Sequence, residues 1–186
     1  MAAKGTYDRA KIAGYTNDII SERFRLTPLR EDHEAGFWHI RSDPDVVRYL
    51  PYQVATDRAQ HKQAFLTDLV EKGRYKFGWA IEWRDASKGD DIPFIGWTIL
   101  RPTEDGRWIE LGYTLRKPFW GLGIATEIND AIVKYAENTL LYPKEDLMAS
   151  VEVGHPASRR VLEKSGFKVT HEEVIDGELC WCFKRA

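Results

Sequence analysis

A short glycine-containing segment carries the most specific chemistry in this sequence. Gly121 and Gly123 lie between a stretch of strand-like alternation and a stretch with the apolar spacing of a helix. Glycine lets the backbone turn tightly, and the first N–H groups of a helix lack intrahelical partners and lie at the positive end of its dipole. Residues 117–127 therefore predict a phosphate or pyrophosphate site or, on the glycines alone, a turn that needs small residues only for packing.

Two common nucleotide-binding patterns do not fit this segment. The dinucleotide-binding pattern needs Gly-x-Gly-x-x-Gly, and Thr126 occupies the position of the third glycine. The phosphate-binding loop of nucleoside triphosphatases ends in Gly-Lys-Ser or Gly-Lys-Thr, which is absent here. The segment therefore belongs to a different strand–turn–helix arrangement.

Apolar periodicity indicates the elements that position the glycine segment. A period of two predicts about seven strands. Helical spacing predicts four helices: one that Pro44 stops, one from the N-cap Thr56 to Gly73, one beginning at Ile124, and a short one at residues 155–165. The strands are expected at residues 24–29, 77–83, 92–100, 107–115, 147–153, 167–175 and 179–183. This order predicts a mixed α/β (α+β) fold, with a mostly antiparallel sheet and helices on both faces.

Composition and charge limit the classes of function. A chain of 186 residues with 43% apolar and 30% charged residues fits one folded domain. Its formal net charge of −2 gives no overall electrostatic signal for nucleic acid or an anionic membrane. The start of the chain lacks the apolar core of a signal peptide, and no apolar run approaches the roughly 20 residues that span a bilayer. We expect a cytoplasmic protein with neither nucleic acid nor membrane as a partner.

The two cysteines predict neither a disulfide nor a metal site. Cys180 and Cys182 lie two apart on a predicted strand, so their side chains point the same way, which is poor geometry for a mutual disulfide. The flanking residues Leu179, Trp181 and Phe183 offer no further metal ligand. Two half-buried thiols are expected.

Four segments, in this order and spacing, resemble one known family. They are residues 24–32, 42–50, 109–127 and 158–167. Together they are similar to the GCN5-related N-acetyltransferase (GNAT) family, and especially to the branch with the ribosomal-protein N-terminal acetyltransferases. The resemblance covers nearly the whole chain from residue 24. It implies a single acetyltransferase domain at residues 23–186 after an N-terminal extension at 1–22, and a GNAT-like sheet splayed between its fourth and fifth strands.

The resemblance also implies acetyl-CoA (coenzyme A) as co-substrate and no metal. In the family, the strand before the glycine turn pairs with the pantetheine arm, and the turn and helix start bind the pyrophosphate. Gly112 in that strand fits a bulge or a close backbone approach. The implied cofactor-binding residues are Tyr113, Thr114 and Leu115 for the arm, and Trp120, Gly121, Leu122, Gly123, Ile124, Ala125 and Thr126 for the pyrophosphate.

The implied reaction transfers acetyl directly to an amine, without a covalent enzyme intermediate. The amine must first lose its proton, which at pH 7 costs about 1.4 kcal/mol for an α-amine and about 4.6 kcal/mol for lysine. Glu110 matches the acidic position common in this branch and is the candidate base, directly or through a water. The alternative is a solvated strand carboxylate, or one paired with Arg107 or Arg116.

Three further positions bear on catalysis. Leu162 stands where many relatives have a tyrosine that protonates the leaving thiolate, so a tyrosine acid is not expected there. Ser158 matches the serine of the branch and is the second candidate catalytic residue, through a hydrogen bond to the sulfur, or else is an ordinary first-turn serine. His155 stands where the branch usually has an asparagine that caps the helix and touches coenzyme A, and we expect it to contact the cofactor.

The sequence thus predicts an N-acetyltransferase that moves acetyl from acetyl-CoA to an amine. The acceptor is a protein or peptide α-amine, or a small amine such as an amino acid, a polyamine or an antibiotic. The alternatives are a non-catalytic coenzyme A-binding sensor or interaction protein, and an acyltransferase with a different acyl donor or a hydroxyl acceptor. The closing hairpin, with Trp181 and Phe183, serves either a homodimer contact or the core.

Overall fold

The computed structural model describes residues 6–8, 14–73, 75–85, 87 and 92–186. Within these residues, eight strands form one sheet in the order β1-β2-β3-β4-β5-β6-β8-β7. The strands are β1 (Ile19–Ile20), β2 (Phe24–Pro28), β3 (Gly78–Trp83), β4 (Phe94–Pro102), β5 (Ile109–Leu115), β6 (Leu147–Glu152), β7 (Phe167–Ile175) and β8 (Glu178–Arg185). Neighbours pair antiparallel, except β5 and β6, which are parallel.

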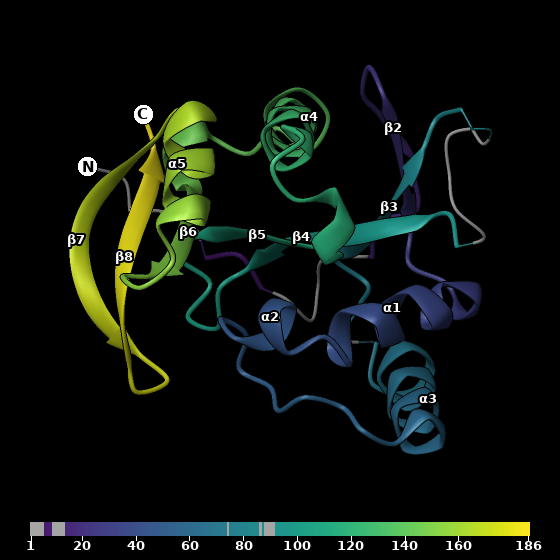
Figure 1. Cartoon of the computed structure of the whole chain (residues 1–186). Coiled ribbons are helices and arrows are strands. Elements are labelled where there is room, and N and C mark those ends of the chain that lie inside the picture. The colour runs from purple at the N-terminus through teal and green to yellow at the C-terminus, as the bar shows by residue number, and fades with distance from the viewer. Residues whose placement is uncertain (1–5, 9–13, 74, 86, 88–91) are drawn as a thin grey trace.

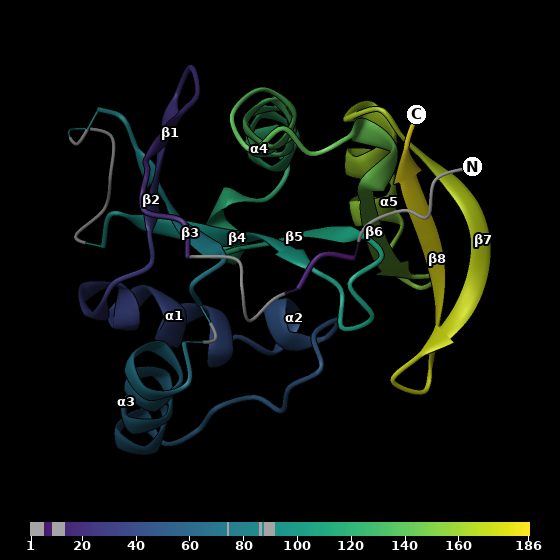
Figure 2. The same ribbon diagram turned by 180° about the vertical axis from the view of Figure 1, so that it is seen from behind.

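Helices cover both faces of the sheet (Figures 1 and 2). On one face lie α4 (Ile124–Asn138) and α5 (Pro156–Lys164). On the other face lie α1 (Glu34–Arg41), α2 (Pro44–Val47) and α3 (Arg58–Leu66), which continues into the turn η2 (Thr67–Glu71). Three short 3-10 turns complete the described elements: η1 (Glu31–His33), η4 (Lys117–Phe119) and η5 (Lys144–Asp146). The mixed α/β fold predicted from periodicity is confirmed.

Each face of the sheet has its own hydrophobic core. The larger core joins α4 to the central strands, with Ile128 and Ile132 fully buried against residues such as Leu111 and Phe183. The smaller core lies under α1 and α3 and includes Phe37, with Phe65 and Phe94 among its members. Because strand residues alternate between faces, membership of a core shows which way each β5 side chain points.

The strand count is eight rather than about seven, because Ile19 and Ile20 add a short strand. Ile19 pairs with Leu26, and its side chain is buried in the larger core. Two residues are too few to produce a detectable alternation in the sequence. Within the predicted N-terminal extension 1–22, residues 1–5 and 9–13 lie outside the described part of the chain.

Two helix boundaries also differ from the prediction. Pro44 stops α1 as expected, but it also occupies the first turn of α2, which the Asp43 side chain caps by accepting from the backbone N–H of Asp45. The N-cap of α3 is Asp57 rather than Thr56, since the Asp57 carboxylate accepts from Gln60 N–H. At both helix starts several neighbouring polar residues could act as the N-cap, so the sequence does not fix which one does.

The closing hairpin forms as Asp176 and Gly177 predict. Both residues have positive φ, 53° and 89°, as a two-residue hairpin turn requires. Cys180 and Cys182 are free and more deeply buried than expected, and burial raises the pKa of both thiols. Phe183 lies in the core, and Trp181 packs partly buried beneath the Arg159 guanidinium.

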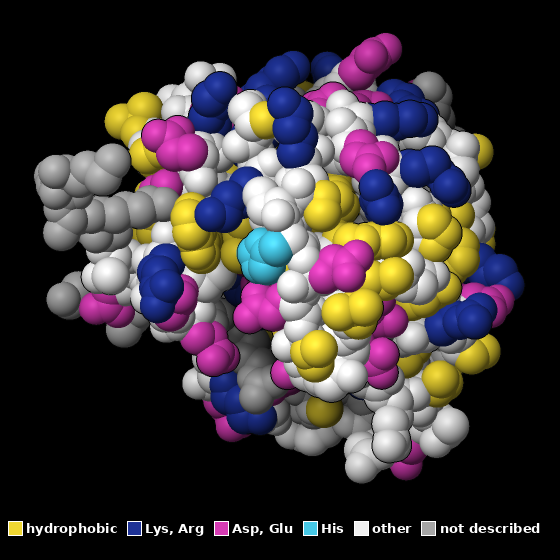
Figure 3. All heavy atoms as spheres, turned by 90° about the vertical axis from the view of Figure 1, so that its left-hand side faces the viewer, with side chains coloured by type: hydrophobic (Ala, Val, Ile, Leu, Met, Phe, Trp, Pro, Cys, Tyr) yellow, Lys and Arg dark blue, Asp and Glu magenta, His cyan; other side chains and the backbone are white. Residues whose placement is uncertain are grey.

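Apolar side chains are exposed on this hairpin. They gather on the face turned toward the viewer in Figure 3. The exposed ones on β7 and β8 are Val169, Val174 and Leu179. The homodimer contact stays a prediction, and these residues, rather than Phe183, are exposed to make it. None of the described helices is both long enough and apolar enough to cross a membrane.

Candidate active site

The two parallel strands at the centre of the sheet diverge after only two paired positions. Ile109 pairs with Leu147 and Glu110 with Met148, and no pairing of β5 with β6 follows toward their C-terminal ends. The peptide groups of residues 111–115 that face β6 therefore lack a strand partner on that side. This is the splay expected between the fourth and fifth predicted strands. It leaves a backbone edge inside the sheet to which an extended ligand can hydrogen-bond.

The glycine turn lies at the wide end of this divergence. Gly121 and Gly123 have φ of 74° and 73°, values that a residue with a Cβ adopts at a cost. Gly123 is the N-cap of α4, and no side chain of the described residues caps that helix end. Gly121 and Gly123 are both exposed, so the turn that leads into α4 is open to solvent. The residues present therefore fit an anionic ligand such as a pyrophosphate.

A carboxylate in the first turn of α4 does not oppose that ligand. Glu127 accepts hydrogen bonds from the Ser21 hydroxyl (2.6 Å) and from the backbone and side chain of Arg23 (2.8 and 2.6 Å). Burial acts to raise the pKa of Glu127, but these donors outweigh it and hold the pKa below its ordinary value. Arg23 also donates to the carbonyl of Leu122, so the β1–β2 hairpin braces the glycine turn.

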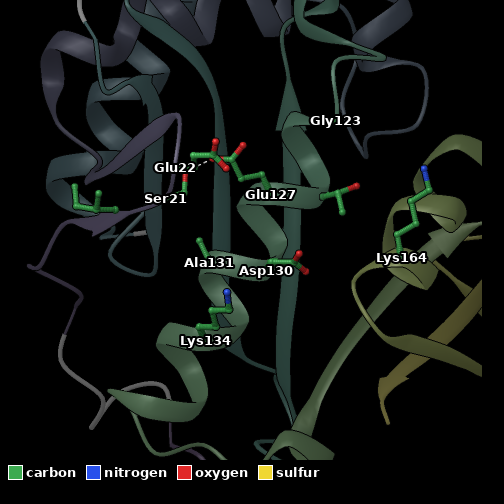
Figure 4. A pocket seen from close by; sticks show the side chains of 10 residues that line it. Ser21, Glu22, Gly123, Glu127, Asp130, Ala131, Lys134 and Lys164 are labelled. Carbon is green, nitrogen blue, oxygen red and sulfur yellow. Dashed lines mark hydrogen bonds between the residues drawn. The ribbon is translucent and has the colours of Figure 1, made fainter.

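A groove of about 670 Å³ runs along α4 from Gly123 (Figure 4). Its walls are the β1–β2 hairpin, α4 and the end of α5, where Lys164 lies. Two lysines, Lys134 on α4 and Lys164, line it together with the acidic residues Glu22, Glu127 and Asp130. No local pattern in the sequence indicates this groove, because its walls are far apart in the chain.

The other predicted cofactor-binding residues differ in what they can offer a ligand. Ile124 and Ala125 bury their side chains in the core, so only their backbone N–H groups are available. Leu122 is exposed, and Trp120 is fixed by a hydrogen bond from its indole N–H to the carbonyl of Leu115 (2.9 Å). Thr126 lines the groove.

Gly112 and Thr114 lie in regular, continuous pairing with β4, so Gly112 is not a bulge. A Cβ on Gly112 would lie 3.1 Å from the Ile99 side chain, and the Gly112 carbonyl accepts from Thr98 Oγ1 at 3.0 Å. The close approach of the Ile99 side chain to the Gly112 backbone is the reason for glycine at this position.

Glu110 lies at the last paired position before the strands diverge. Its carboxylate accepts from Arg101 Nε at 2.8 Å, with the side chain 25% exposed. The partner is Arg101, not Arg107 or Arg116 as the sequence analysis considered. Register explains this, because Arg101 and Glu110 are directly opposite each other on β4 and β5. Glu110 points to the sheet face that α1, α2 and α3 cover, opposite to the neighbouring Leu111, which faces α4.

Tyr113 and Ser158 meet on the opposite face of the sheet. The Tyr113 hydroxyl lies 3.0 Å from Ser158 Oγ, which joins β5 to the first turn of α5. Burial raises the pKa of Tyr113 to about 12, although the hydrogen bond with Ser158 acts to lower it. Leu162 is 1% exposed and part of the larger core, so its side chain does not reach the site.

A short segment bridges the wide end of the divergence on the α1–α3 face. Asp45 of α2 forms an ion pair with Lys117, just before the glycine turn. Tyr49 donates to the carbonyl of Gly154 (3.0 Å) and stacks on the His155 ring, with centroids 4.1 Å apart. The bridge was not predictable from the sequence, because nothing local to residues 43–50 indicates contacts more than 70 residues away.

His155 forms the N-cap of α5 but makes no side-chain capping hydrogen bond. Its ring packs against Tyr49 instead, and burial lowers its pKa below the ordinary 6.5. Its predicted contact with the cofactor stays a prediction.

Replacing His155 by asparagine should reduce the acid sensitivity of folding. The pKa of His155 is lower in the folded state than in the unfolded state. The contribution of its neutral ring to the free energy of unfolding is therefore complete above pH 6.5 and is lost as pH falls below that value. Asparagine does not titrate, so urea unfolding between pH 7.5 and about 5 should show a smaller loss of unfolding free energy in the variant. The other four histidines are present in both proteins, so any contribution from them cancels. Equal losses in both proteins would contradict this assignment.

One group of side chains in the described residues could hold a metal ion. His171, Glu173 and Cys182 bring three ligand atoms within 4.8 Å of one another. They lie on β7 and β8, separated from β5 by β6. They are therefore not part of the divergence between β5 and β6, and the expectation of a metal-free reaction there stays a prediction.

Comparisons with known proteins agree with this geometry. A family model described as an acetyltransferase (GNAT) domain matches residues 23–168. The uncharacterized protein YkkB of Bacillus subtilis (strain 168) is 30% identical over 150 residues, which are 80% of this chain and 83% of that protein.

Two solved structures share the fold. The acetyltransferase (GNAT family) from Bacillus anthracis aligns with a TM-score of 0.73 at 17% identity, over 90% of this chain and 96% of that one. Mycobacterium smegmatis RimJ in complex with CoA-disulfide aligns with a TM-score of 0.71 at 18% identity, over 92% of this chain and 88% of that one. The chain belongs to the GNAT acetyltransferase family.

Proposed function

We propose that this protein transfers the acetyl group of acetyl-CoA directly to an amine. The observation that carries the proposal is the divergence of β5 from β6 at Glu110, with the uncapped N-terminus of α4 at its wide end. The pyrophosphate is held by backbone N–H groups at Gly121–Gly123 and the start of α4. The pantetheine arm hydrogen-bonds the free edge of β5 at Tyr113, Thr114 and Leu115.

The acceptor amine approaches from the α1–α3 face. That face carries Glu110, which takes the amine proton directly or through one water. Arg101 keeps the Glu110 carboxylate in place. The bridge from Asp45 to Tyr49 borders the same opening and contributes to the choice of acceptor.

The acceptor is an α-amine of a protein or peptide, or a small-molecule amine. The resemblance of its segments to the ribosomal-protein N-terminal acetyltransferases supports the first class. An α-amine also asks less of the base, because its pKa lies near 8.

Release of free thiol from acetyl-CoA, measured across a panel of amines, tests the proposal. The panel contains peptides with different N-termini, amino acids, polyamines and aminoglycosides. Thiol release that depends on an amine, with mass spectrometry of the acetylated product, supports an N-acetyltransferase. Tight coenzyme A binding without turnover on any amine would overturn the proposal in favour of a sensor. Preference for a longer acyl-CoA, or acetylation of a hydroxyl, would overturn the assigned donor or acceptor.

Gly123→Ala should weaken coenzyme A binding about tenfold. A residue with a Cβ resists positive φ by about 1–2 kcal/mol, so the alanine backbone shifts and moves the N–H groups at the start of α4. Gly73→Ala is the matched control, because Gly73 also has positive φ (54°) and open space around a Cβ, but lies two residues after the end of η2. Isothermal titration should show weaker binding only in Gly123→Ala. Equal affinities in the two variants would remove the turn from the binding site.

A further inference from the structure

The leaving sulfur needs a group that stabilises its negative charge. Thioester cleavage leaves the bonding electron pair on sulfur, and a buried thiolate without a hydrogen bond is costly. Leu162 cannot supply a donor, because it is an aliphatic residue in the core. The donor must therefore come from another element that borders the divergence of β5 and β6.

The faces of the sheet indicate where that donor lies. Glu110 and Tyr113 are three residues apart on β5, so their side chains leave opposite faces of the strand. Glu110 faces the α1–α3 side, while Tyr113 packs against the larger core on the side of α4 and α5. The amine therefore reaches the thioester carbonyl from the side of Glu110, while a donor to the thioester sulfur can come from the other side, where Tyr113 lies.

Tyr113 is also held in a fixed position. Its hydroxyl lies 3.0 Å from Ser158 Oγ, in the first turn of the nine-residue helix α5. The N-cap side chain of α5, His155, does not satisfy that helix end, so the positive end of the helix dipole faces the same region. A hydroxyl and an uncapped helix N-terminus therefore meet at one point beside the free edge of β5.

We propose that the Tyr113 hydroxyl donates a hydrogen bond to the leaving thiolate of coenzyme A, and that Ser158 positions it by donating to the Tyr113 oxygen. This inference rests on the proposed acetyl transfer. Tyr113 is then a catalytic residue supplied by a strand, and Ser158 is a positioning residue.

The role is stabilisation of charge rather than transfer of a proton. The amine nitrogen forms a bond to the carbonyl carbon, the carbon–sulfur bond breaks, and its electron pair stays on sulfur. The amine proton leaves through Glu110 or its water. A phenol of pKa about 12 keeps its proton beside a thiolate whose conjugate acid has a pKa near 8.5. Tyr113 therefore remains a neutral donor across the working pH range.

The test combines kinetics with a direct titration of the bound thiol. A hydrogen bond to a charged group is worth roughly tenfold to a hundredfold in an equilibrium, so Tyr113→Phe should lower kcat by about 30-fold with little change in KM for acetyl-CoA. Ultraviolet absorbance of the thiolate in the enzyme–coenzyme A complex should show the thiol pKa raised by about one unit in Tyr113→Phe. Binding of desulfo-coenzyme A, which lacks the sulfur, should be unchanged.

Three further variants separate positioning from general damage. Ser158→Ala should lower kcat less than Tyr113→Phe does and raise the bound-thiol pKa by a smaller amount, and Ser158→Thr should restore both. Tyr142→Phe removes a tyrosine hydroxyl that contacts Tyr15 in another part of the fold, and it should leave kcat unchanged. If Tyr113→Phe does not fold, the bound-thiol pKa of Ser158→Ala decides the question.

Two results would overturn the assignment of Tyr113 and leave the proposed function standing. One is normal turnover and an unchanged bound-thiol pKa in Tyr113→Phe; the other is a larger defect in Ser158→Ala than in Tyr113→Phe, which would make the serine the donor. Failure of the wild-type protein to bind coenzyme A would instead overturn the proposed function, and this assignment with it.

Discussion

Glu110→Gln is expected to lower kcat about a hundredfold at pH 7, and far less at a pH above the pKa of the acceptor amine. General-base catalysis by a positioned carboxylate typically contributes 10²–10⁴-fold. Below its pKa the amine is mostly protonated and depends on a base. Above its pKa the amine is already neutral, so glutamine, which keeps the shape but not the basicity, should be tolerated.

The ion pair with Arg101 provides the matched control. A partly exposed pair of this kind is worth about 0–1 kcal/mol, so neither partner is needed to hold the fold. Arg101→Gln breaks the same contact but leaves the carboxylate, and it should lower kcat by less than Glu110→Gln. Full pH profiles of kcat and kcat/KM for both variants would show the difference. A loss in Glu110→Gln that is the same at every pH, or equal losses in both variants, would leave Glu110 a structural residue only.

Tyr15→Ala is expected to lower the free energy of unfolding by about 3 kcal/mol, the lower end of what removing a buried aromatic side chain costs. Tyr15 is only 8% exposed. Its ring stacks on the fully buried Trp79, with centroids 4.6 Å apart and planes within 10°. Trp79 is in turn fixed by a hydrogen bond from its indole N–H to the carbonyl of Asn17 (2.9 Å). Alanine removes the ring and leaves a cavity over Trp79.

Tyr52→Ala is the matched control for that loss, because Tyr52 is 45% exposed. Its ring contacts the Arg41 guanidinium, an exposed contact of about 0.5–1 kcal/mol. Urea unfolding of both variants measures the difference. If Tyr15→Ala cost no more than Tyr52→Ala, the segment around Tyr15 would be an appendage, as the division at residue 22 implies, rather than part of the core.

Local patterns in the sequence were enough for most of the fold. Alternation along residues 147–153, helical spacing after Ile124, and the dipeptide Asp176-Gly177 each depend on neighbours within a few residues. Backbone geometry and side-chain periodicity act at that range, so these elements form as predicted. The glycine turn was predictable for the same reason, since positive φ at Gly121 and Gly123 is a local requirement.

Pairings between distant residues were not predictable in this way. Ile19 and Tyr15 have no periodic neighbours, and only their burial against β2 and Trp79 makes them part of the core. The partner of Glu110 depends on the register of β4 against β5, which one residue of slippage would change.

The sequence by itself determined the order of elements, the glycine turn and, through resemblance, the family. Only the tertiary structure decided that Tyr113 reaches Ser158, that Tyr49 stacks on His155 and that Asp45 pairs with Lys117. These pairs are 45 or more residues apart. Their contacts arise because β5 and β6 stop pairing and α2 and α5 lie on opposite faces of the sheet beside that divergence. Geometry of this kind results from packing many segments into shared cores, and no local stretch of sequence carries it.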